Sequence, residues 1–303
     1  MAMEKTNEII VADNNDLTQE QKTEEELIHA LDQKSIDGWM KDWFLNSVEN
    51  YSIIPKDRPK TINQLRNIHE GEEAVILASG PSLDENISYL KKFKGRIFAT
   101  NSTINPCIAN GVTPDWVVNL DADKYVAEQF KDLDTKKMKV ILATYCHSSL
   151  IKLFSPNLIW WFVIFDDRHW FLYGGQHILF PNIDGLLGST CSPGAACRLA
   201  WLMGIKKMYL LGFDFSYPKG KNRCTYYVKE KGAWIANGMD QYALDRSPTK
   251  IVRGKKTSIK LEVTHAAVTN MIKRLSGIEI IDCSKGIMYG FQKMDFRKVV
   301  ESQ

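Results

Sequence analysis

Residues 74–83, AVILASGPSL, join an apolar run of strand length to a tight Ser79-Gly80-Pro81-Ser82 turn, and the helix-like segment DENISYLKKF follows. In an α/β sheet such a corner points helix N-terminal amides at an anion. Pro81 fits the first helical position, and Ser82 or Asp84 is suited to capping the first turn. The P-loop ending and the three spaced glycines of dinucleotide folds are absent. The stretch therefore predicts either a phosphate-binding corner or an ordinary strand-to-helix turn.

Strand-like and helix-like segments alternate after this corner. We predict strands over 73–78, 97–100, 115–120, 139–144, 158–165, 207–212 and 278–282, and helices over 84–93, 103–110, 124–132, 193–204 and 264–275. This alternation predicts an α/β fold with a Rossmann-like, doubly wound, mainly parallel sheet. Ligands of such sheets bind at the carboxyl ends of the strands.

The composition limits the classes of partner. With 303 residues, 44% of them hydrophobic, the chain suits one sizeable domain with an extension. A net charge of +3 gives no reason to expect nucleic acid or a membrane surface, and the apolar run at 158–165 is too short to span a membrane. The N-terminus lacks a signal pattern, so we expect a cytoplasmic protein. Six scattered cysteines without a CxxC pair argue against zinc and disulfides.

The two ends of the chain differ from the middle. Residues 1–32 hold nine acidic and two basic side chains, so we expect a flexible acidic tail over 1–25. A helical extension and linker should occupy 26–70, starting at the Thr23/Glu26 capping-box pattern and including a short helix over 61–70. Its apolar group, Trp39, Met40, Trp43, Phe44 and Val48, requires a partner surface, which is either the main domain or another subunit of a homo-oligomer. The domain itself is predicted over 71–292, with a C-terminal tail over 293–303.

Polar residues follow several predicted strands. Asn101 and Asn119 offer donors and acceptors suited to sugar hydroxyls or base edges. Asp121 and Asp123 form a DxD pair that suits magnesium on a diphosphate, or else two solvated turn residues. Asp214, in GFDFSY, is a third candidate carboxylate or a cap.

A second corner and a mixed loop complete the candidate pocket. Gly188, Ser189 and Thr190 precede the apolar helix AACRLAWLMG, which either repeats the anion-binding pattern or only caps the helix. Tyr217 and Tyr226 lie in a loop that also contains lysines and an arginine, a composition suited to gripping phosphate or simply to solvation.

Two histidines are candidates for a general base, because histidine titrates near neutral pH. His265 lies within the helical pattern EVTHAAVTNMIKRL, and His147 follows the strand KVILAT. A lone helical histidine is more often structural, so both assignments stay open.

The ordered motifs GPSLD, VNLDAD, GSTCSPGAACRLAWLMGIKKMYLLGFDFSY and IEIIDCSKGIMYGF resemble the 6-hydroxymethylpterin diphosphokinase-like domain that is shared with motility accessory factor glycosyltransferases. The resemblance covers about residues 70–290. A more distant similarity is to bacterial sialyltransferases that use CMP-sialic acid on a Rossmann-like fold. These also have a GPSL turn, an asparagine after the second strand and a G-x-D-F strand end.

The glycosyltransferase branch implies a CMP-activated nonulosonate donor and a hydroxyl-bearing small molecule or glycan as acceptor. The GPSL turn, Asn101 and Asn119 would bind the nucleotide, Ser189 or Thr190 the sugar or cytosine side, and Tyr217 with Tyr226 the leaving phosphate. A histidine would deprotonate the acceptor. However, the sialyltransferase histidine precedes its helix, whereas His265 lies inside the pattern.

The diphosphokinase branch implies that Asp121, Asp123 and Asp214 hold Mg²⁺ while ATP donates a diphosphate to a pterin alcohol. Motility accessory factors are much longer and carry flanking domains. We favour the glycosyltransferase, with the diphosphokinase second and a non-catalytic nucleotide-binding assembly module third.

Overall fold

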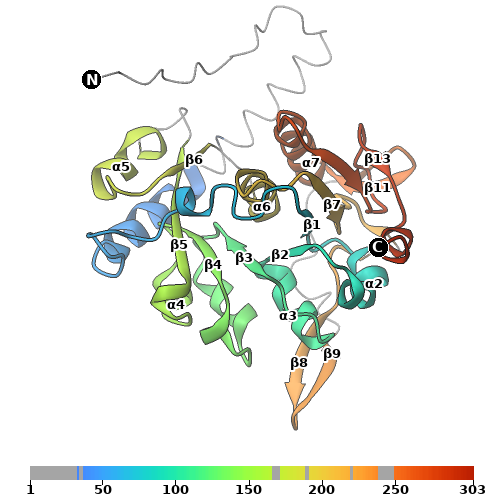
Figure 1. Cartoon of the computed structure of the whole chain (residues 1–303), viewed down its shortest axis with the longest axis horizontal. Coiled ribbons are helices and arrows are strands. Elements are labelled where there is room, and N and C mark those ends of the chain that lie inside the picture. The colour runs from blue at the N-terminus through green and yellow to red at the C-terminus, as the bar shows by residue number, and fades with distance from the viewer. Residues whose placement is uncertain (1–32, 34–36, 166–170, 188–190, 219–220, 238–248) are drawn as a thin grey trace, which may run out of the picture.

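The computed structural model describes residues 33, 37–165, 171–187, 191–218, 221–237 and 249–303 (Figure 1). Within these residues nine strands form one parallel sheet in the order β13-β12-β7-β1-β2-β3-β4-β5-β6. Two antiparallel hairpins, β8–β9 and β10–β11, lie outside it. The predicted Rossmann-like, mainly parallel α/β fold is confirmed.

The seven predicted strands are present, with no end shifted by more than one residue. The sheet strands are β1 (Glu73–Leu77), β2 (Arg96–Thr100), β3 (Trp116–Asn119), β4 (Val140–Ala143), β5 (Ile159–Phe165), β6 (Gly185–Leu187), β7 (Lys207–Leu211), β12 (Glu279–Asp282) and β13 (Gln292–Lys293). The edge strands β6 and β13 were not predicted, because three and two residues are too short to show a periodic pattern.

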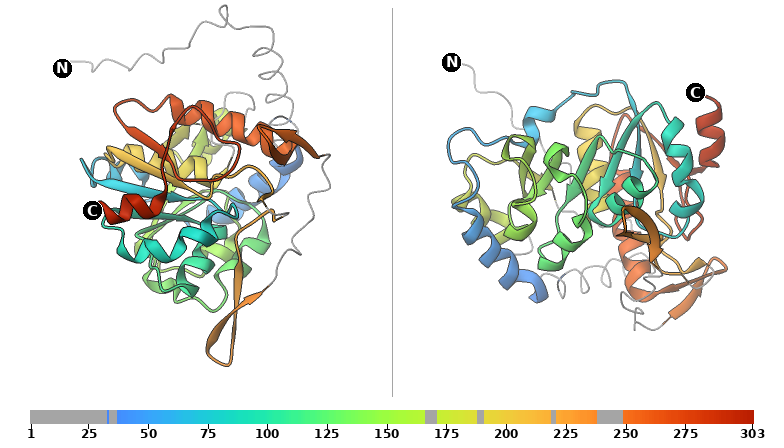
Figure 2. Two further views of the ribbon diagram at one scale, coloured as in Figure 1. Left: turned by 90° about the vertical axis from the view of Figure 1, so that its right-hand side faces the viewer. Right: turned by 90° about the horizontal axis from the view of Figure 1, so that it is seen from below.

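Helices cover both faces of the sheet (Figures 1 and 2). The α-helices are α2 (Leu83–Asn86), α3 (Asn101–Ala109), α4 (Ser148–Ile151), α5 (Gln176–Leu179), α6 (Ser192–Leu202), α7 (Ile259–Lys273) and α8 (Phe296–Glu301). The predicted helix over 84–93 continues after α2 as the 3-10 helix η3 (Ile87–Lys92), and the helix over 124–132 is the 3-10 helix η4 (Lys124–Phe130). The helix expected over 61–70 reduces to η2 (Ile62–Leu65).

Strand β1 shows why the sheet is buried on both faces. Ala74 and Ile76 belong to the large apolar cluster that includes α6, whereas Val75 and Leu77 belong to the cluster that includes Leu83 of α2. All four side chains have no exposed surface. A continuous apolar run, and not an alternating one, is typical of such a central parallel strand.

The strand order reverses next to β1. From β1 the chain adds strands in one direction as far as β6, then crosses back through α6 and places β7 on the other side of β1. Ligands of open α/β sheets bind at such a switch point, beyond the carboxyl ends of the strands. The turn after β1 therefore lies where a ligand is expected.

The helix over residues 37–50 packs against this domain. Asn46 donates from Nδ2 to the carbonyls of Ala122 and Tyr145, both at 3.0 Å, and Asn50 donates to the carbonyls of Thr144 and Cys146 at 2.8 and 2.7 Å. These bonds anchor the helix to the loops that follow β3 and β4, so its polar residues and not only its apolar ones provide the contact.

The predicted apolar group contacts the domain through two ring pairs, Trp43 against Tyr145 and Phe44 against Phe171, with ring centroids 5.3 and 5.6 Å apart. Met40 and Trp43 also pack against the pair Phe171 and Leu172. Trp39, Phe44 and Val48 remain 38–49% exposed. A second subunit covering them stays a prediction. The acidic tail over 1–25 and the capping box at Thr23 lie outside the described residues.

Residues 293–303 are part of the domain and not the tail that was predicted. Phe296 has no exposed surface and Val299 has 1%, because α8 packs on the cluster that contains Leu90 and Phe93. The boundary at residue 71 is also too late, since Ile54 and Ile62 belong to the large core cluster. No helix in the described part of the chain combines the length and the apolarity needed to cross a membrane.

Candidate functional site

The turn after β1 contacts the segment after β7 directly. The Gly80 amide donates to the Gly212 carbonyl at 2.8 Å, and the Ser82 amide donates to Asp214 Oδ2 at 2.7 Å. The anion at the start of α2 is therefore the protein's own carboxylate. This is the position at which the sequence suggested a ligand phosphate.

Asp214 also connects these segments to β12. Its Oδ1 accepts from the Lys285 amide at 2.9 Å, and its carbonyl accepts from the Ile287 amide at 2.9 Å. Asp214 is 1% exposed. With both carboxylate oxygens bonded to backbone amides, Asp214 joins the ends of β1, β7 and β12, and we assign it a structural role in place of the predicted catalytic one.

Glycine is required on both sides of this contact. A Cβ at Gly80 would lie 2.4 Å from the Gly212 carbonyl oxygen and 2.5 Å from Asp214 Oδ2. Gly212 has a φ of +77°, and a Cβ there would lie 1.9 Å from the Ala78 carbonyl oxygen. The close backbone approach within the protein thus explains these glycines without a ligand.

The capping predicted for α2 is absent. Ser82 forms no side-chain cap, and its buried Oγ has no hydrogen-bond partner in the described part of the chain. Asp84 accepts instead from the amide and the hydroxyl of Thr225 at 2.8 and 2.9 Å. Asp84 therefore positions the loop that carries the candidate cations Lys221 and Arg223.

The two aspartates of the DxD pair lie in the loop after β3 and have different hydrogen-bond partners. Asn119 is fully buried and bonds to the backbone of Asp121 through both its amide nitrogen and its oxygen. Asp123 accepts from the Tyr125 amide at 2.9 Å and caps η4. Asn119 and Asp123 thus shape the loop. Asp121 and Asp123 each accept one backbone hydrogen bond through Oδ1, and no bond to Oδ2 of either residue occurs in the described part of the chain.

Asp121 has an unusual environment. Burial raises its pKa, the neighbouring Asp123 charge raises it further, and the Asp123 amide and the Arg223 charge oppose this. Its Oδ1 accepts from the Asp123 amide at 3.0 Å, and no bond to Oδ2 occurs within the described residues. Asp121 is therefore a half-buried carboxyl group with one available oxygen.

A magnesium ion would have few protein ligands at this edge. Among the residues described, no three His, Cys, Asp or Glu side chains are grouped so as to hold a metal ion. Mg²⁺ often binds through one or two carboxylates together with substrate phosphates and water. Asp121 and Asp123 fit only this second kind of site.

Helix α3 contributes to the same edge of the sheet. Asn101 is its first residue and is 8% exposed, and the described residues provide no hydrogen-bond partner for its amide. One turn later Asn105 exchanges two 2.8 Å bonds with the backbone of Tyr227. These bonds anchor β8 (Tyr226–Glu230) on α3, and the Tyr226 hydroxyl donates to the Glu128 carbonyl at 3.3 Å.

Sequence reasoning missed Asn105. The only signal was a polar residue inside a short helix, directly before Pro106. The structure shows that it fixes Tyr226 near the loop containing Asp121. The hairpin of β8 and β9 (Ala233–Asn237) projects from the body of the molecule beyond this anchor (Figures 1 and 2).

Helix α6 begins at the same edge. It contacts β1, β2 and β3, and Ser192 Oγ accepts from the Leu120 amide at 3.3 Å. Its first residues thus lie beside the loop that carries Asp121. Gly188, Ser189 and Thr190, the predicted second corner, lie outside the described residues.

Tyr217 holds the other hairpin. Its amide donates to the Lys256 carbonyl at 2.8 Å and its hydroxyl to Ser258 Oγ at 3.0 Å. These bonds dock β10 (Thr249–Val252) and β11 (Lys255–Ser258) on the segment after β7. Its predicted contact with a leaving phosphate remains a prediction.

The two histidines lie in unequal positions. His147 caps α4, with Nδ1 near the Ser149 amide and hydroxyl. His265 is 4% exposed on α7, between the rings of Phe215 and Tyr289 at 5.5 and 5.2 Å. Burial, with three nearby cations, lowers its pKa to about 4. An imidazole enclosed between two aromatic rings favours a structural role for His265.

The structure thus groups the predicted residues into two sets. Asn101 at the end of β2 and Asp121 after β3 form the first set, with Ser192 bonded to the Leu120 amide and Arg223 close enough to lower the pKa of Asp121. Tyr226 joins this set through η4, where it bonds to the Glu128 carbonyl. His265 and Asp214 belong to the packing around β7. Asn119 and Asp123 support the first set through the backbone. We take the first set as the candidate site.

The chain is similar to known proteins in sequence and in fold. A family model described as "6-hydroxymethylpterin diphosphokinase MptE-like" matches residues 45–220. An uncharacterized protein of Treponema pallidum (strain Nichols) is 31% identical over 83 residues, which is 27% of this chain and 38% of that protein. The structure of MAf glycosyltransferase from Magnetospirillum magneticum AMB-1 superposes with a TM-score of 0.53 at 15% identity, covering 80% of this chain and 38% of that one. The chain spans less than two fifths of either protein, and the structural likeness concerns the fold.

Proposed function

Because this chain belongs to the 6-hydroxymethylpterin diphosphokinase MptE-like family, we propose that it is a nucleotide-dependent transferase that moves a sugar from a CMP-nonulosonate-like donor to a hydroxyl acceptor. The solved neighbour with the same fold is titled a glycosyltransferase, which supports this choice within the family. The donor would bind at the carboxyl ends of β2 and β3, beside Asn101 and Arg223.

The observation that carries the proposal is the unequal use of the three strand-end carboxylates. Asp214 accepts hydrogen bonds from backbone amides through both carboxylate oxygens, and Asp123 caps η4. Asp121 is half-buried, and this burial raises its pKa. Of the three carboxylates that a diphosphokinase would use to bind magnesium, Asp214 is thus already occupied by the backbone. A single carboxyl group with a raised pKa suits a general base instead.

The reaction needs three events at this site. Asp121 accepts the proton of the acceptor hydroxyl, and the acceptor oxygen forms a bond to the anomeric carbon of the donor. The bond between that carbon and the phosphate oxygen breaks, and CMP leaves with the electron pair. Arg223 is placed to neutralise the charge that develops on the phosphate.

The test is nucleotide release from a panel of CMP- and UDP-sugars, with each candidate acceptor, by the full-length protein. Asp121→Asn should lower kcat by roughly 10²- to 10⁴-fold, the usual contribution of a general base, with little change in donor KM. Arg223→Met should raise donor KM. Asp123→Asn is the matched control, because asparagine caps a helix as well as aspartate does and should leave kcat within about twofold.

Equal activity of Asp121→Asn and wild type would contradict the assignment of the base. Binding of a CMP-sugar without release of nucleotide under any acceptor condition would favour the nucleotide-binding module.

The diphosphokinase is the second candidate, because the family description names that activity and Asp121 lies beside Asp123. In that reaction Mg²⁺ would bind to these two carboxylates and to the phosphates of ATP. AMP formation from ATP that depends on 6-hydroxymethylpterin and on magnesium, and that both Asp121→Asn and Asp123→Asn abolish, would support it over glycosyl transfer.

A further inference from the structure

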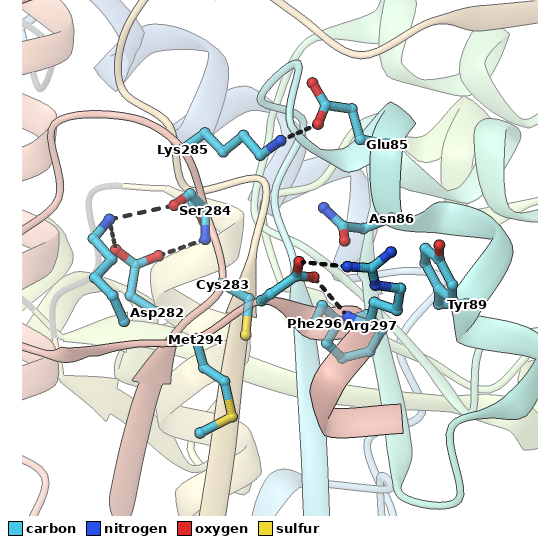
Figure 3. Close-up of a pocket in the computed structure, with 12 residues that line it drawn as sticks. Glu85, Asn86, Tyr89, Asp282, Cys283, Ser284, Lys285, Met294, Phe296 and Arg297 are labelled. Atoms are coloured by element: carbon cyan, nitrogen blue, oxygen red, sulfur yellow. Dashed lines mark hydrogen bonds and ion pairs between the residues drawn. The ribbon is translucent and has the colours of Figure 1, made fainter. Parts of the chain in front are cut away.

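A cavity apart from the candidate site lies at the carboxyl edge of the sheet, beyond β12 (Figure 3). It has a volume of about 420 Å³ and lies between the α2–η3 segment, the end of β12 and the start of α8. Small-molecule sites have volumes of roughly 300–1,000 Å³. The cavity is thus large enough for one or two sugar-sized rings, and none of the residues of the proposed transferase site lines it.

A thin wall separates this cavity from the packing around Asp214. The Lys285 amide donates to Asp214 Oδ1 on one side, whereas the Lys285 side chain lines the cavity and pairs with Glu85 on the other. Glu85 and Asn86 belong to α2, directly after the GPSL turn. The cavity is therefore a separate site that shares one wall with the switch point.

The charges around the cavity balance. Its six charged lining residues form three ion pairs, which are Lys285 with Glu85, Lys293 with Asp282 at 2.5 Å, and Arg297 with Asp295 at 3.8 Å. Three cations and three carboxylates give a net charge of zero. A phosphate or carboxylate ligand needs a surplus of cations, so the lining favours an uncharged ligand.

The uncharged polar groups of the cavity can form hydrogen bonds with the hydroxyl groups of a ligand. Asn86 is 6% exposed and donates from Nδ2 to the Ser82 carbonyl at 3.0 Å, while its Oδ1 has no partner among the described residues. In Figure 3 the Asn86 oxygen points toward the Arg297 guanidinium. A buried amide held by one bond presents its second polar atom in a fixed direction, which suits recognition of a donor group.

Tyr89 provides an apolar face. Its ring lies beside the Arg297 guanidinium (Figure 3), and Met294 and Phe296 also line the cavity. An aromatic face opposite fixed polar groups fits a ligand with an apolar C–H face and a rim of hydroxyls. A hydroxyl both donates and accepts, so it can bridge the carboxylate and the cation of a closed ion pair.

We propose that this cavity binds a neutral polyhydroxylated ligand, a sugar ring or a cyclitol, stacked on Tyr89 and hydrogen-bonded to Asn86 Oδ1 and to the paired charges around it. The site does not require the transferase reaction. It remains available when Asp121 is replaced, because the two sites have no lining residue in common.

Saturation-transfer NMR on the full-length chain tests the proposal. The probes are the methyl glycosides of glucose, galactose, mannose and N-acetylglucosamine, with myo-inositol as the cyclitol and methyl phosphate and glycine as charged comparators. At least one neutral probe should bind. Tyr89→Ala should weaken its binding at least tenfold, and Tyr89→Phe, which keeps the ring, should leave it within about twofold. Asp121→Asn should leave binding unchanged.

Several results would overturn the proposal. The first is the absence of saturation transfer to every neutral probe at tens of millimolar, and the second is saturation transfer to methyl phosphate or glycine alone. The third is unchanged binding by Tyr89→Ala. Loss of binding on adding CMP or in Asp121→Asn would place the ligand in the other site. If Tyr89→Ala fails to fold, Arg297→Met decides, because it changes a half-exposed side chain on α8. It should weaken the same probe at least threefold, and an equal affinity would count against the site.

Discussion

Replacing Asp214 with asparagine tests whether a carboxylate, and not a ligand, occupies the start of α2. Asp214 accepts from the Ser82 and Lys285 amides at 2.7 and 2.9 Å while 1% exposed. Asparagine can accept from one of these amides only, and its own NH₂ group must face the other. Hydrogen bonds to charged groups contribute about 1.5–3 kcal/mol each, and a buried unsatisfied donor costs about as much. We expect Asp214→Asn to lower the free energy of unfolding by about 3 kcal/mol.

Thermal and urea unfolding of the full-length protein provide the measurement. For a protein of this size, 3 kcal/mol corresponds to a fall in Tm of roughly 6–12 °C. The matched control is Asp123→Asn, which also removes a carboxylate that accepts a backbone amide, but at a helix cap where asparagine is equally good. Its stability should change by less than about 0.5 kcal/mol. Equal Tm values for Asp214→Asn and the control would refute the structural role of the carboxylate.

Three further predictions concern stability and anchoring. The pKa of His265 is about 4 in the folded protein against 6.5 in the unfolded chain, so the unfolded chain binds more protons between these two pH values. The free energy of unfolding therefore falls as the pH is lowered through this interval, by about 3 kcal/mol in all. Denaturation at pH 7.5 and 4.5 should show a smaller loss of stability for His265→Gln than for wild type. Asn105→Ala removes both bonds to the Tyr227 backbone, so amide hydrogen exchange over 226–230 should rise at least tenfold, while β10 and β11 stay unchanged as an internal control. Asn50→Ala leaves two carbonyls after β4 without their donor and should cost about 2 kcal/mol in urea unfolding, against under 0.5 kcal/mol for the exposed Lys41→Ala.

The parallel core of the sheet could be predicted because its strands are buried on both faces. Val140 to Ala143 and Lys207 to Leu211 are continuous apolar runs of strand length, apart from the first residue of β7. The projecting hairpins were not predicted, since their side chains are largely exposed and rich in lysine. Each has a turn with two positive φ angles, Lys231-Gly232 and Arg253-Gly254. Such turns favour hairpins, yet a lysine or arginine before glycine is a weaker signal than asparagine before glycine.

The candidate site could be predicted only in outline. The strand ends directed attention to Asn101, Asp121 and Asp214, and the structure places all three at the carboxyl edge. However, 132 residues separate Ser82 from Asp214, and no local pattern reveals that this amide and this carboxylate meet. Burial of His265 between two aromatic rings is equally invisible in a helical pattern. The residue types showed which side chains could act as a base or bind a ligand. The tertiary contacts determined which of these side chains are not already bonded or buried within the protein.

The occupied turn has a consequence for where a donor phosphate can bind. Asp214 places a negative charge at the amides of the first strand-to-helix turn, so a phosphate there would be repelled and would find the Ser82 amide already bonded. The next helix starts along the edge are those of α3 and α6, and Arg223 lies close enough to Asp121 to lower its pKa. Phosphate binding is therefore expected between these two helices. The conspicuous GPSL turn would then serve this site indirectly, by fixing the ends of β1, β7 and β12.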